Sequence, residues 1–529
     1  MTSVQFKTKI AKWLASYGVW LIALVAVLLR IEPLNDELIP YMFCDEEIWL
    51  REAKRMLGEN TIVPEVFLSG SPVLLPVVIV AHLVNALSDG LITTVLSDSL
   101  ITTDNRLLVM ARICLLIPSI LGSIYFLNKA FRVLQVSDFS RLSALLVLVI
   151  NPTGLATSRY WYPDHFIIFP ASLVLYTVIR VGVNRNSSNR SWVGVGMAIG
   201  LLASTKYTGI LVIVTTIPLL YSQWNAEYQL HSRFIRMAQR TVSLIGGTIG
   251  SFTFINFGAI TKPRLFLRDL LGNNANYEQF TGGVSAVITH TYYAMVLPFG
   301  ILALPLLALG MSRLARQSRP LLFAVILFPV LLVVVLSVYG FGVPRNTFII
   351  LPFLVLVLGM GVDSMHKPLR CIRITQRLST IILFITLAPM AAESTIGVVR
   401  DWKPDSRLLA EDSIKSIIPK LATVGVNDGC SGPGVPRVMG YRTVNDPMMS
   451  ERLDFYVFDS YWRSSVSDAY KGDWWQRYFH FYRFGDNSIP PFPILSKPEL
   501  QVPSGYELIA KFSGDGPEIV VLRRTLTGG

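Results

Sequence analysis

Three acidic residues stand at the ends of apolar segments, where they could take part in catalysis. Asp45 and Glu46 follow the first apolar segment, and Asp164 directly precedes a later one. A carboxylate at such a place can deprotonate an acceptor hydroxyl group. It can equally be a solvated loop residue or, for Asp164, a favourable charge at a helix N-terminus, worth about 0.3–1 kcal/mol. The pattern indicates chemistry at a membrane face and leaves these simpler interpretations open.

Two basic residues complement these acids. Lys206 lies in an otherwise apolar hairpin, and Arg345 follows a turn that contains glycine and proline. An ammonium group within a membrane segment costs about 2.5–3.5 kcal/mol, although a residue near a helix end can extend its side chain to water. Cations can also stabilise the charge that develops on a departing phosphate. We therefore interpret Lys206 and Arg345 as candidate contacts for a lipid-linked phosphate.

The composition shows what kind of elements must position these residues. Of the 529 residues, 52% are hydrophobic and 16% are charged, whereas a soluble protein carries about 25% charged residues. Apolar stretches of about 17–22 residues recur, enough to cross roughly 30 Å of hydrocarbon. The net charge of +12 is divided among short loops, as membrane topology requires, so we expect no nucleic-acid partner. The sequence predicts a polytopic α-helical membrane protein.

The positive charges also predict the topology. Basic residues occur before the first apolar segment and in five later loops, and both sets share the cytoplasmic side only if segment 72–87 does not cross. We therefore expect 72–87 to lie on the surface, a cytoplasmic N-terminus, and a multi-pass protein of the plasma (inner) membrane. Eleven crossing helices are predicted, near 13–30, 107–127, 142–158, 164–181, 191–205, 207–222, 241–258, 291–311, 321–338, 347–363 and 378–395.

Two domains follow from this topology. Residues 1–396 form the membrane domain, whose long external loop 31–106 includes an amphipathic interfacial helix at 48–57. Residues 397–529 are polar enough for a small external α/β domain. Its predicted strands are 424–426, 455–458 and 518–522, and its predicted helix is 406–421. The four cysteines form no CxxC or His/Cys cluster, so we expect no structural zinc site; the sequence leaves dependence on another divalent metal open.

This topology places all five candidate residues on one side of the membrane, and the motifs around them resemble a known family. The chain resembles the GT-C superfamily of membrane glycosyltransferases, in the branch of the protein O-mannosyltransferases and the lipid A aminoarabinose transferase. The resemblance spans most of the membrane domain. The motifs that carry it are Phe43-x-Asp45-Glu46-x4-Arg51-x-Ala53, Ser158-Arg159-x4-Asp164, Gly200-Leu201-x4-Lys206-Tyr207-x-Gly209, Pro344-Arg345-x6-Pro352 and Asp405-Ser406-Arg407-x2-Ala410.

The resemblance implies an inverting transfer of a monosaccharide from a polyprenyl-phosphate donor on the external face. It implies that Asp45 is the general base, that Glu46 or Asp164 orients the acceptor or the base, and that Lys206, Arg345 and Arg159 contact phosphate. The sequence departs from the family at two places: Ser71-Pro72-Val73-Leu74 stands where the family often has His-Pro-Pro-Leu, and Asn346 stands where it usually has Tyr.

Other functions fit part of the pattern. A transporter or flippase needs charges near the bilayer midplane and commonly has internal repeats, and we find neither. A polysaccharide ligase would use a different donor, and a non-catalytic scaffold would tolerate replacement of the acidic residues. The expected partners are membrane lipids, a polyprenyl-phosphate-linked sugar, and a lipid, glycan or protein acceptor. The sequence does not identify the sugar.

Overall fold

A computed structural model describes most of the membrane domain and parts of the C-terminal region. The described residues are 17–30, 44–67, 71–91, 104–151, 154–155, 161, 163–184, 187–225, 230–278, 283–296, 298–300, 303–339, 344–366, 413–414, 416–419, 422–426, 442–445, 453–459, 506–512 and 519–525. The chain divides into two compact units, one comprising Met1–Glu32 with Arg51–Ser394 and the other Pro33–Leu50 with Thr395–Gly529. Each unit is described by itself.

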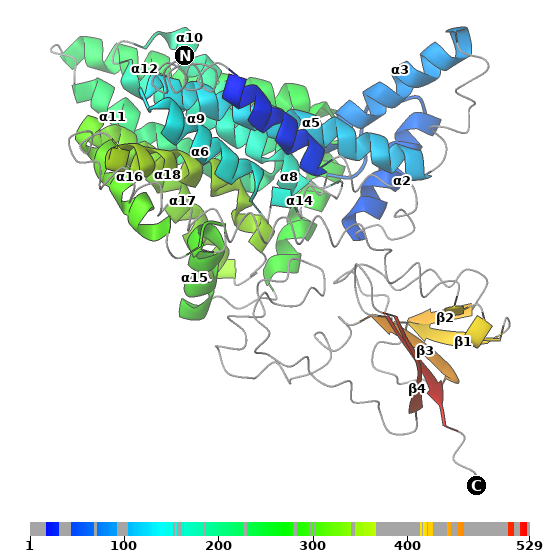
Figure 1. Ribbon diagram of the computed structural model, residues 1–529. Coiled ribbons are helices and arrows are strands. Elements are labelled where there is room, and N and C mark those ends of the chain that lie inside the picture. Colours follow the sequence, from blue (N-terminus) through cyan, green and yellow to red (C-terminus); the bar gives the residue numbers. More distant parts are fainter. Residues whose placement is uncertain are drawn as a thin grey trace. The chain divides into compact units, whose positions relative to one another are not determined.

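Helices make up the described part of the first unit (Figure 1). After the helix Tyr17–Arg30, they are α2 (Cys44–Gly58), η2 (Ser71–Val73), α3 (Leu75–Leu91), α5 (Asp104–Val133), α6 (Asp138–Val149), α8 (Pro163–Phe166), α9 (Ile168–Val183), α10 (Asn189–Thr205), η3 (Tyr207–Thr216), α11 (Ile217–Asn225), α12 (Leu230–Ile255), α13 (Phe257–Thr261), α14 (Pro263–Glu278), α15 (Val284–Thr291), η4 (Tyr292–Val296), α16 (Leu304–Gln317), α17 (Arg319–Tyr339), η6 (Pro344–Ile350) and α18 (Leu351–His366).

Four of the described helices are long and apolar enough to cross a membrane. They span Met110–Val133, Pro163–Val183, Arg319–Val338 and Asn346–Met365, and each overlaps a predicted crossing. Two shorter apolar helices, Tyr17–Arg30 and Leu75–Val84, accompany them. The chain is therefore a multi-helical membrane protein, as the sequence predicts. The total of eleven crossings stays a prediction, and its last member, 378–395, lies outside the described residues.

Several predicted crossings, among them 291–311 and 207–222, are not continuous α-helices. Segment 291–311 contains a π-helical turn, a turn at Pro298–Phe299 and Gly300 with φ of +74°, and α16 begins only at Leu304. Proline lacks the amide hydrogen that a helix needs, and glycine readily adopts a positive φ. Segment 207–222 begins as 3-10 helix and becomes α-helical only at Ile217. Predictions based on hydrophobicity alone overlook such breaks, because the broken segment remains apolar.

The predicted helix at 48–57 has the expected amphipathic pattern. In α2, Leu50, Ala53 and Met56 are buried, whereas Arg51 and Lys54 are exposed. This helix is predicted at 48–57, and the structure confirms it. The α3 helix covers most of the predicted surface segment 72–87. Its placement relative to a membrane stays a prediction.

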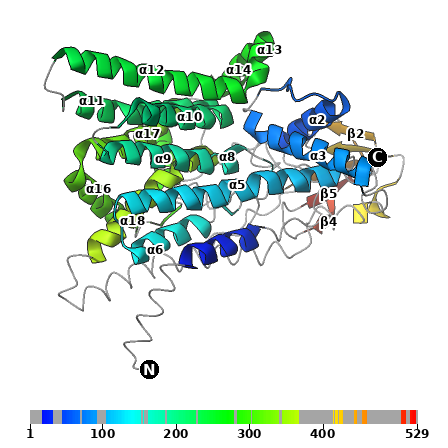
Figure 2. The ribbon, with the colours of Figure 1, turned by 90° about the horizontal axis from the view of Figure 1, so that it is seen from above.

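Close helix packing fixes the position of α10, the helix that leads to Lys206. Figure 2 shows α12 running beside α10. Gly196 and Gly200 of α10 face the α12 backbone so closely that a Cβ atom at either position would overlap a carbonyl oxygen, that of Leu244 or that of Thr248. Small residues four positions apart permit such contact between membrane helices. The α10–α12 pair therefore packs backbone against backbone.

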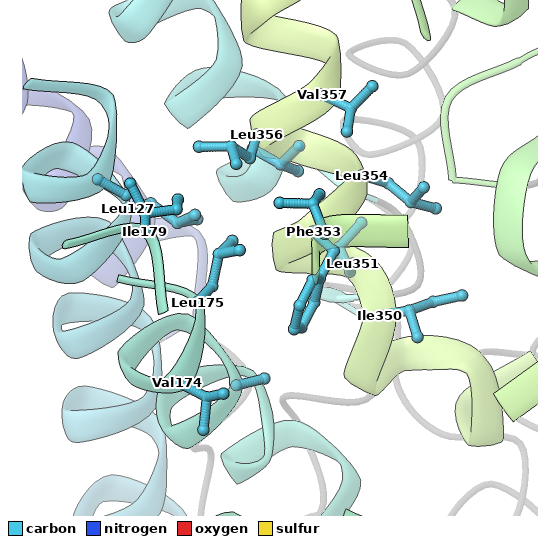
Figure 3. Packing of buried hydrophobic residues seen from close by; sticks show 14 of the residues in the cluster. Leu127, Val174, Leu175, Ile179, Ile350, Leu351, Phe353, Leu354, Leu356 and Val357 are labelled. Atoms are coloured by element: carbon cyan, nitrogen blue, oxygen red, sulfur yellow. The ribbon is translucent and has the colours of Figure 1, made fainter. Parts of the chain in front are cut away.

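A second set of contacts holds α9 against α18. Figure 3 shows Leu175 and Ile179 of α9 near Phe353 and Leu356 of α18, all fully buried. At the end of α18, the buried carboxylate of Asp363 pairs with Arg313 and accepts a hydrogen bond from the backbone amide of Ser137 at 3.1 Å. This apolar core and ion pair determine where the N-terminal ends of α9 and η6 lie.

The second unit contains a five-stranded sheet of order β2-β1-β3-β5-β4. Its parallel half is β1 (Thr423–Val426) between β2 (Arg442–Asn445) and β3 (Phe455–Asp459), and its antiparallel half adds β5 (Ile519–Arg524) and β4 (Tyr506–Phe512). The predicted strands are β1, β3 and β5, and all three are confirmed. Of the predicted helix 406–421, the described residues 413–414 and 416–419 include Ile414 and Ile418, which pack on the sheet.

The glycine contacts give a first testable prediction. Gly196→Ala should destabilise the protein by about 1–3 kcal/mol, the usual cost of overpacking, because the new methyl group meets backbone rather than a mobile side chain. Gly194→Ala is the matched control on the same helix, since nothing lies within 4 Å of its added Cβ, and alanine favours a helix over glycine by about 1 kcal/mol. Thermal unfolding in detergent measures both. Equal melting temperatures for the two variants would contradict the packing described.

Candidate functional site

Lys206 joins three separate parts of the chain. It is the residue between α10 and η3, where the backbone is extended at φ −147° and ψ 125°. Its Nζ atom donates one hydrogen bond to Asp164 Oδ1 at 2.5 Å and another to Asn346 Oδ1 at 2.9 Å. The lysine hairpin, the head of α9 and the head of α18 therefore converge on one ammonium group.

Burial of this cluster is uneven. The side chain of Asp164 is 3% exposed, whereas that of Lys206 is 22% exposed, and Asn346 is buried. A buried carboxylate needs a counter-charge, because an unpaired one is costly in a medium of low dielectric constant. Asp164 thus keeps Lys206 in place. The ammonium group has three N–H donors, of which two are used within the described residues, and it remains in part accessible to an anion.

Two short helical turns carry the partners of Lys206. Asp164 lies in α8, which begins with Pro163, and Asn346 lies in η6, which begins with Pro344. Proline at the first helical position presets the backbone angle at no hydrogen-bond cost. Ser119 of α5 holds α8 in place by donating a hydrogen bond to the carbonyl oxygen of His165 at 2.6 Å. These turns place short polar side chains at the edge of an apolar bundle.

The residue after Lys206 ties the cluster to the first loop. The Tyr207 hydroxyl donates to the carbonyl oxygen of Phe67 at 2.9 Å, and the Phe67 amide donates to Asp269 Oδ2 at 3.0 Å. Two residues before Phe67, the Oε1 atom of Glu65 pairs with the Nζ atom of Lys262 at 2.5 Å. The segment 61–67, which we name the strap, therefore connects α2 with α13, α14 and the lysine hairpin. The sequence analysis did not identify the strap.

The predicted site residues fall into two groups. The structure brings Asp164 and Lys206 together, as a shared site requires. The side chains of Asp45, Glu46 and Arg345 are not among the described ones, and Arg159 lies outside the described residues. Asp45 and Glu46 occupy the first turn of α2, and their part in the site stays a prediction.

Asn346 is the residue of this cluster that the sequence analysis did not propose for the site. It was noted only as the position where the chain departs from the family. That departure was the available signal, because a short amide replaces a large phenol next to Arg345. Within the described residues, no group of three or more histidine, cysteine, aspartate and glutamate side chains could hold a metal ion, and metal dependence remains open.

The ion pair gives a second prediction. Lys206→Met should destabilise the protein by about 3 kcal/mol, the lower end for breaking a buried pair, because it leaves Asp164 buried without this counter-charge. The double variant Asp164→Asn/Lys206→Met should recover more than half of that loss. Thermal unfolding of the two single variants and the double variant gives the coupling. Strictly additive losses would show that the two side chains do not interact.

The strap gives a third prediction, for the dependence of stability on pH. A hydrogen bond from Lys262, together with the nearby charge of Arg55, lowers the pKa of Glu65 below 4.5. Because the folded-state pKa is the lower one, the contact stabilises the protein above the unfolded-state pKa and is lost as pH falls through the folded-state value. Wild type should exceed Glu65→Gln in melting temperature at pH 6, by the small amount typical of exposed pairs. The difference should begin to shrink as pH falls below the unfolded-state pKa of about 4.3 and should vanish below the lower, folded-state pKa. A constant difference would contradict this assignment.

Comparison with known proteins identifies the fold. No family model matches the sequence, and no curated protein matches it. ArnT from Cupriavidus metallidurans bound to undecaprenyl phosphate is similar with a TM-score of 0.53 and 14% identity, over 97% of this chain and 99% of that one. The apo state of ArnT is similar with a TM-score of 0.53 and 12% identity, over 96% and 98%.

A third solved structure is more distant. The archaeal oligosaccharyltransferase AglB from Archaeoglobus fulgidus, in complex with an inhibitory peptide and a dolichol-phosphate, is similar with a TM-score of 0.49 and 10% identity, over 85% of this chain and 69% of that one. The likeness to ArnT covers the chain almost from end to end and confirms the expected architecture. The chain shares the fold of ArnT, which agrees with the resemblance described in the sequence analysis.

Proposed function

We propose that this protein is a membrane glycosyltransferase that uses a polyprenyl-phosphate-linked monosaccharide as donor. The acceptor is a lipid, a glycan or a protein, and the transfer takes place on the external face. The observation that carries the proposal is the partly exposed ammonium group of Lys206, held at a helix break by buried Asp164 and Asn346. The fold supports it, because ArnT, whose fold the chain shares, has been captured with undecaprenyl phosphate.

The proposed chemistry requires a cation where the phosphate departs. The acceptor oxygen attacks the anomeric carbon as it loses its proton, and the bond from that carbon to the phosphate oxygen breaks. The phosphate leaves with the electron pair, and the configuration inverts. A preorganised ammonium group stabilises the charge that develops on this oxygen. In this mechanism Lys206 contacts the phosphate, and Arg345 and Arg159 supply further positive charge.

The ion pair distinguishes the roles of the carboxylates. Asp164 is buried and accepts a hydrogen bond from the ammonium group of Lys206, so its part is to position Lys206. The proton then passes to a different carboxylate. In the proposal Asp45 is the general base, and Glu46 orients the acceptor.

The fourth prediction tests the base. Asp45→Asn keeps the shape of the side chain and removes its basicity, so turnover should fall by roughly 10²–10⁴, the usual effect of losing a general base. Glu46→Gln should cost less. Glu47→Gln is the matched control on the same helical turn and should retain nearly full activity.

The measurement is mass spectrometry of lipid-linked sugars and surface glycans in a deletion strain that expresses each variant. Asp45→Asn should accumulate the sugar-loaded carrier lipid at normal protein levels. Full activity of Asp45→Asn would contradict the mechanism. An equal loss in Glu47→Gln would instead indicate a general electrostatic role of this helical turn.

A further inference from the structure

Arg30, at the end of the first apolar helix, is a buried cation without a counter-charge among the described residues. Its side chain is 2% exposed. Nη1 donates to the carbonyl oxygen of Ala26, one turn back in the same helix, at 3.1 Å. Nε and Nη2 are buried and have no hydrogen-bond partner in the part of the chain that the structure describes. Two N–H-bearing nitrogens of the guanidinium are therefore buried with no acceptor among the described residues.

His165 is a second buried polar group of this kind, next to Arg30. It is 2% exposed, and neither ring nitrogen has a hydrogen-bond partner among the described residues. The guanidinium of Arg30 is close enough to act on the imidazole electrostatically. The backbone carbonyl of His165, in contrast, accepts a hydrogen bond from Ser119. In either neutral tautomer the ring offers one N–H donor.

Backbone and an aromatic ring border the guanidinium. Gly154 is adjacent to it, since a Cβ atom at this position would lie 3.6 Å from Arg30 Nη2 and 3.1 Å from Cζ of Phe348. Glycine is thus the residue that allows the guanidinium and the Phe348 ring to lie on one side of this backbone. Gly154 contributes only backbone and Phe348 only aromatic carbon, so neither residue neutralises the charge of Arg30.

Burying a guanidinium group in this way is unfavourable in free energy unless an acceptor with negative charge binds it. A buried unpaired charge costs several kcal/mol, and hydrogen-bond donors buried without acceptors add to that cost. Two other arginines with little exposure have a carboxylate partner, since Arg141 pairs with Asp138 and Arg313 pairs with Asp363. The arginine fork is suited to two-point recognition of phosphate or carboxylate. An anion with at least two oxygen atoms would supply the acceptors that the described residues do not.

We infer that Arg30 and His165 form a binding site for an oxyanion of the phosphate type, separate from the contact at Lys206. Asp164 and His165 are consecutive residues of α8, and consecutive side chains of a helix point about 100° apart. Asp164 contacts Lys206, so His165 and Arg30 occupy a different side of this turn. The inference does not rest on the proposed sugar transfer, because it concerns binding alone.

The test is ligand-dependent thermal unfolding of the full-length protein in detergent. Inorganic phosphate, matched in ionic strength by chloride, is one probe, and undecaprenyl phosphate in micelles is the other. Wild type is compared with Arg30→Met, Arg30→Lys and His165→Gln. Arg180→Met is the matched control, because Arg180 is an exposed arginine in the last turn of a membrane helix.

The expected result has two parts. Without ligand, Arg30→Met should melt at a higher temperature than wild type, because it removes an uncompensated buried charge, while Arg180→Met should melt as wild type does. With ligand, Arg30→Met should bind about ten- to hundredfold more weakly than wild type, the loss expected for charged hydrogen bonds. Arg30→Lys and His165→Gln should show intermediate losses. Protection by inorganic phosphate identifies a soluble occupant, and protection by undecaprenyl phosphate alone identifies a lipid.

The same comparison in the Asp164→Asn/Lys206→Met background separates this site from the proposed donor contact. Protection that depends on Arg30 should persist there. Equal protection of wild type and Arg30→Met, or no protection of wild type by either probe, would overturn the inference. A variant Arg30→Met that melts at a lower temperature than wild type, or does not fold, would also overturn it, because the guanidinium would then serve the fold. None of these results bears on whether the protein transfers a sugar.

Discussion

An ammonium group within an apolar hairpin must find oxygen acceptors, and this need organises the membrane domain around Lys206. Its partners, Asp164 and Asn346, come from turns that precede α9 and α18. Those turns meet only because the two helices pack against each other through a continuous apolar core (Figure 3). The position of Lys206 itself depends on the close contact of α10 with α12. Packing thus determines where the charges meet, and the charges in turn make any other arrangement costly.

Three cations in this unit, of which Arg30 is the most deeply buried, differ in how fully their charge is neutralised. Arg313 pairs with a fully buried aspartate that is itself capped by Ser137. Lys206 has a buried carboxylate and an amide oxygen but remains 22% exposed. Arg30 has a single backbone carbonyl within the described residues. A complete pair serves the fold, whereas an incomplete one keeps donors available. This gradation is the physical reason for assigning binding to Lys206 and Arg30 and structure to Arg313.

The sequence predicted these features unequally. Asp164 and Lys206 were identified because charges are rare beside membrane segments, so each one stands out. Asn346 was missed because an amide carries no such signal, and the strap was missed because its contacts to Lys262 and Asp269 join residues about two hundred positions apart. Helix positions followed from hydrophobicity, but the break at Pro298–Gly300 did not, because a window average hides two residues. Strands β2 and β4 were missed, since edge strands have weaker apolar patterns than central ones.

The pairing of Lys206 with Asp164 also limits what this cation can do alone. Together the two groups are neutral, so they offer an approaching phosphate a hydrogen bond and a local dipole rather than a net positive charge. The pair gives the lysine a buried counter-charge while no substrate is bound. A phosphate that departs with its full charge then requires a further cation. This is why the proposed mechanism needs Arg345 or Arg159 beside Lys206, and why Asp164 cannot serve as the base without releasing the lysine.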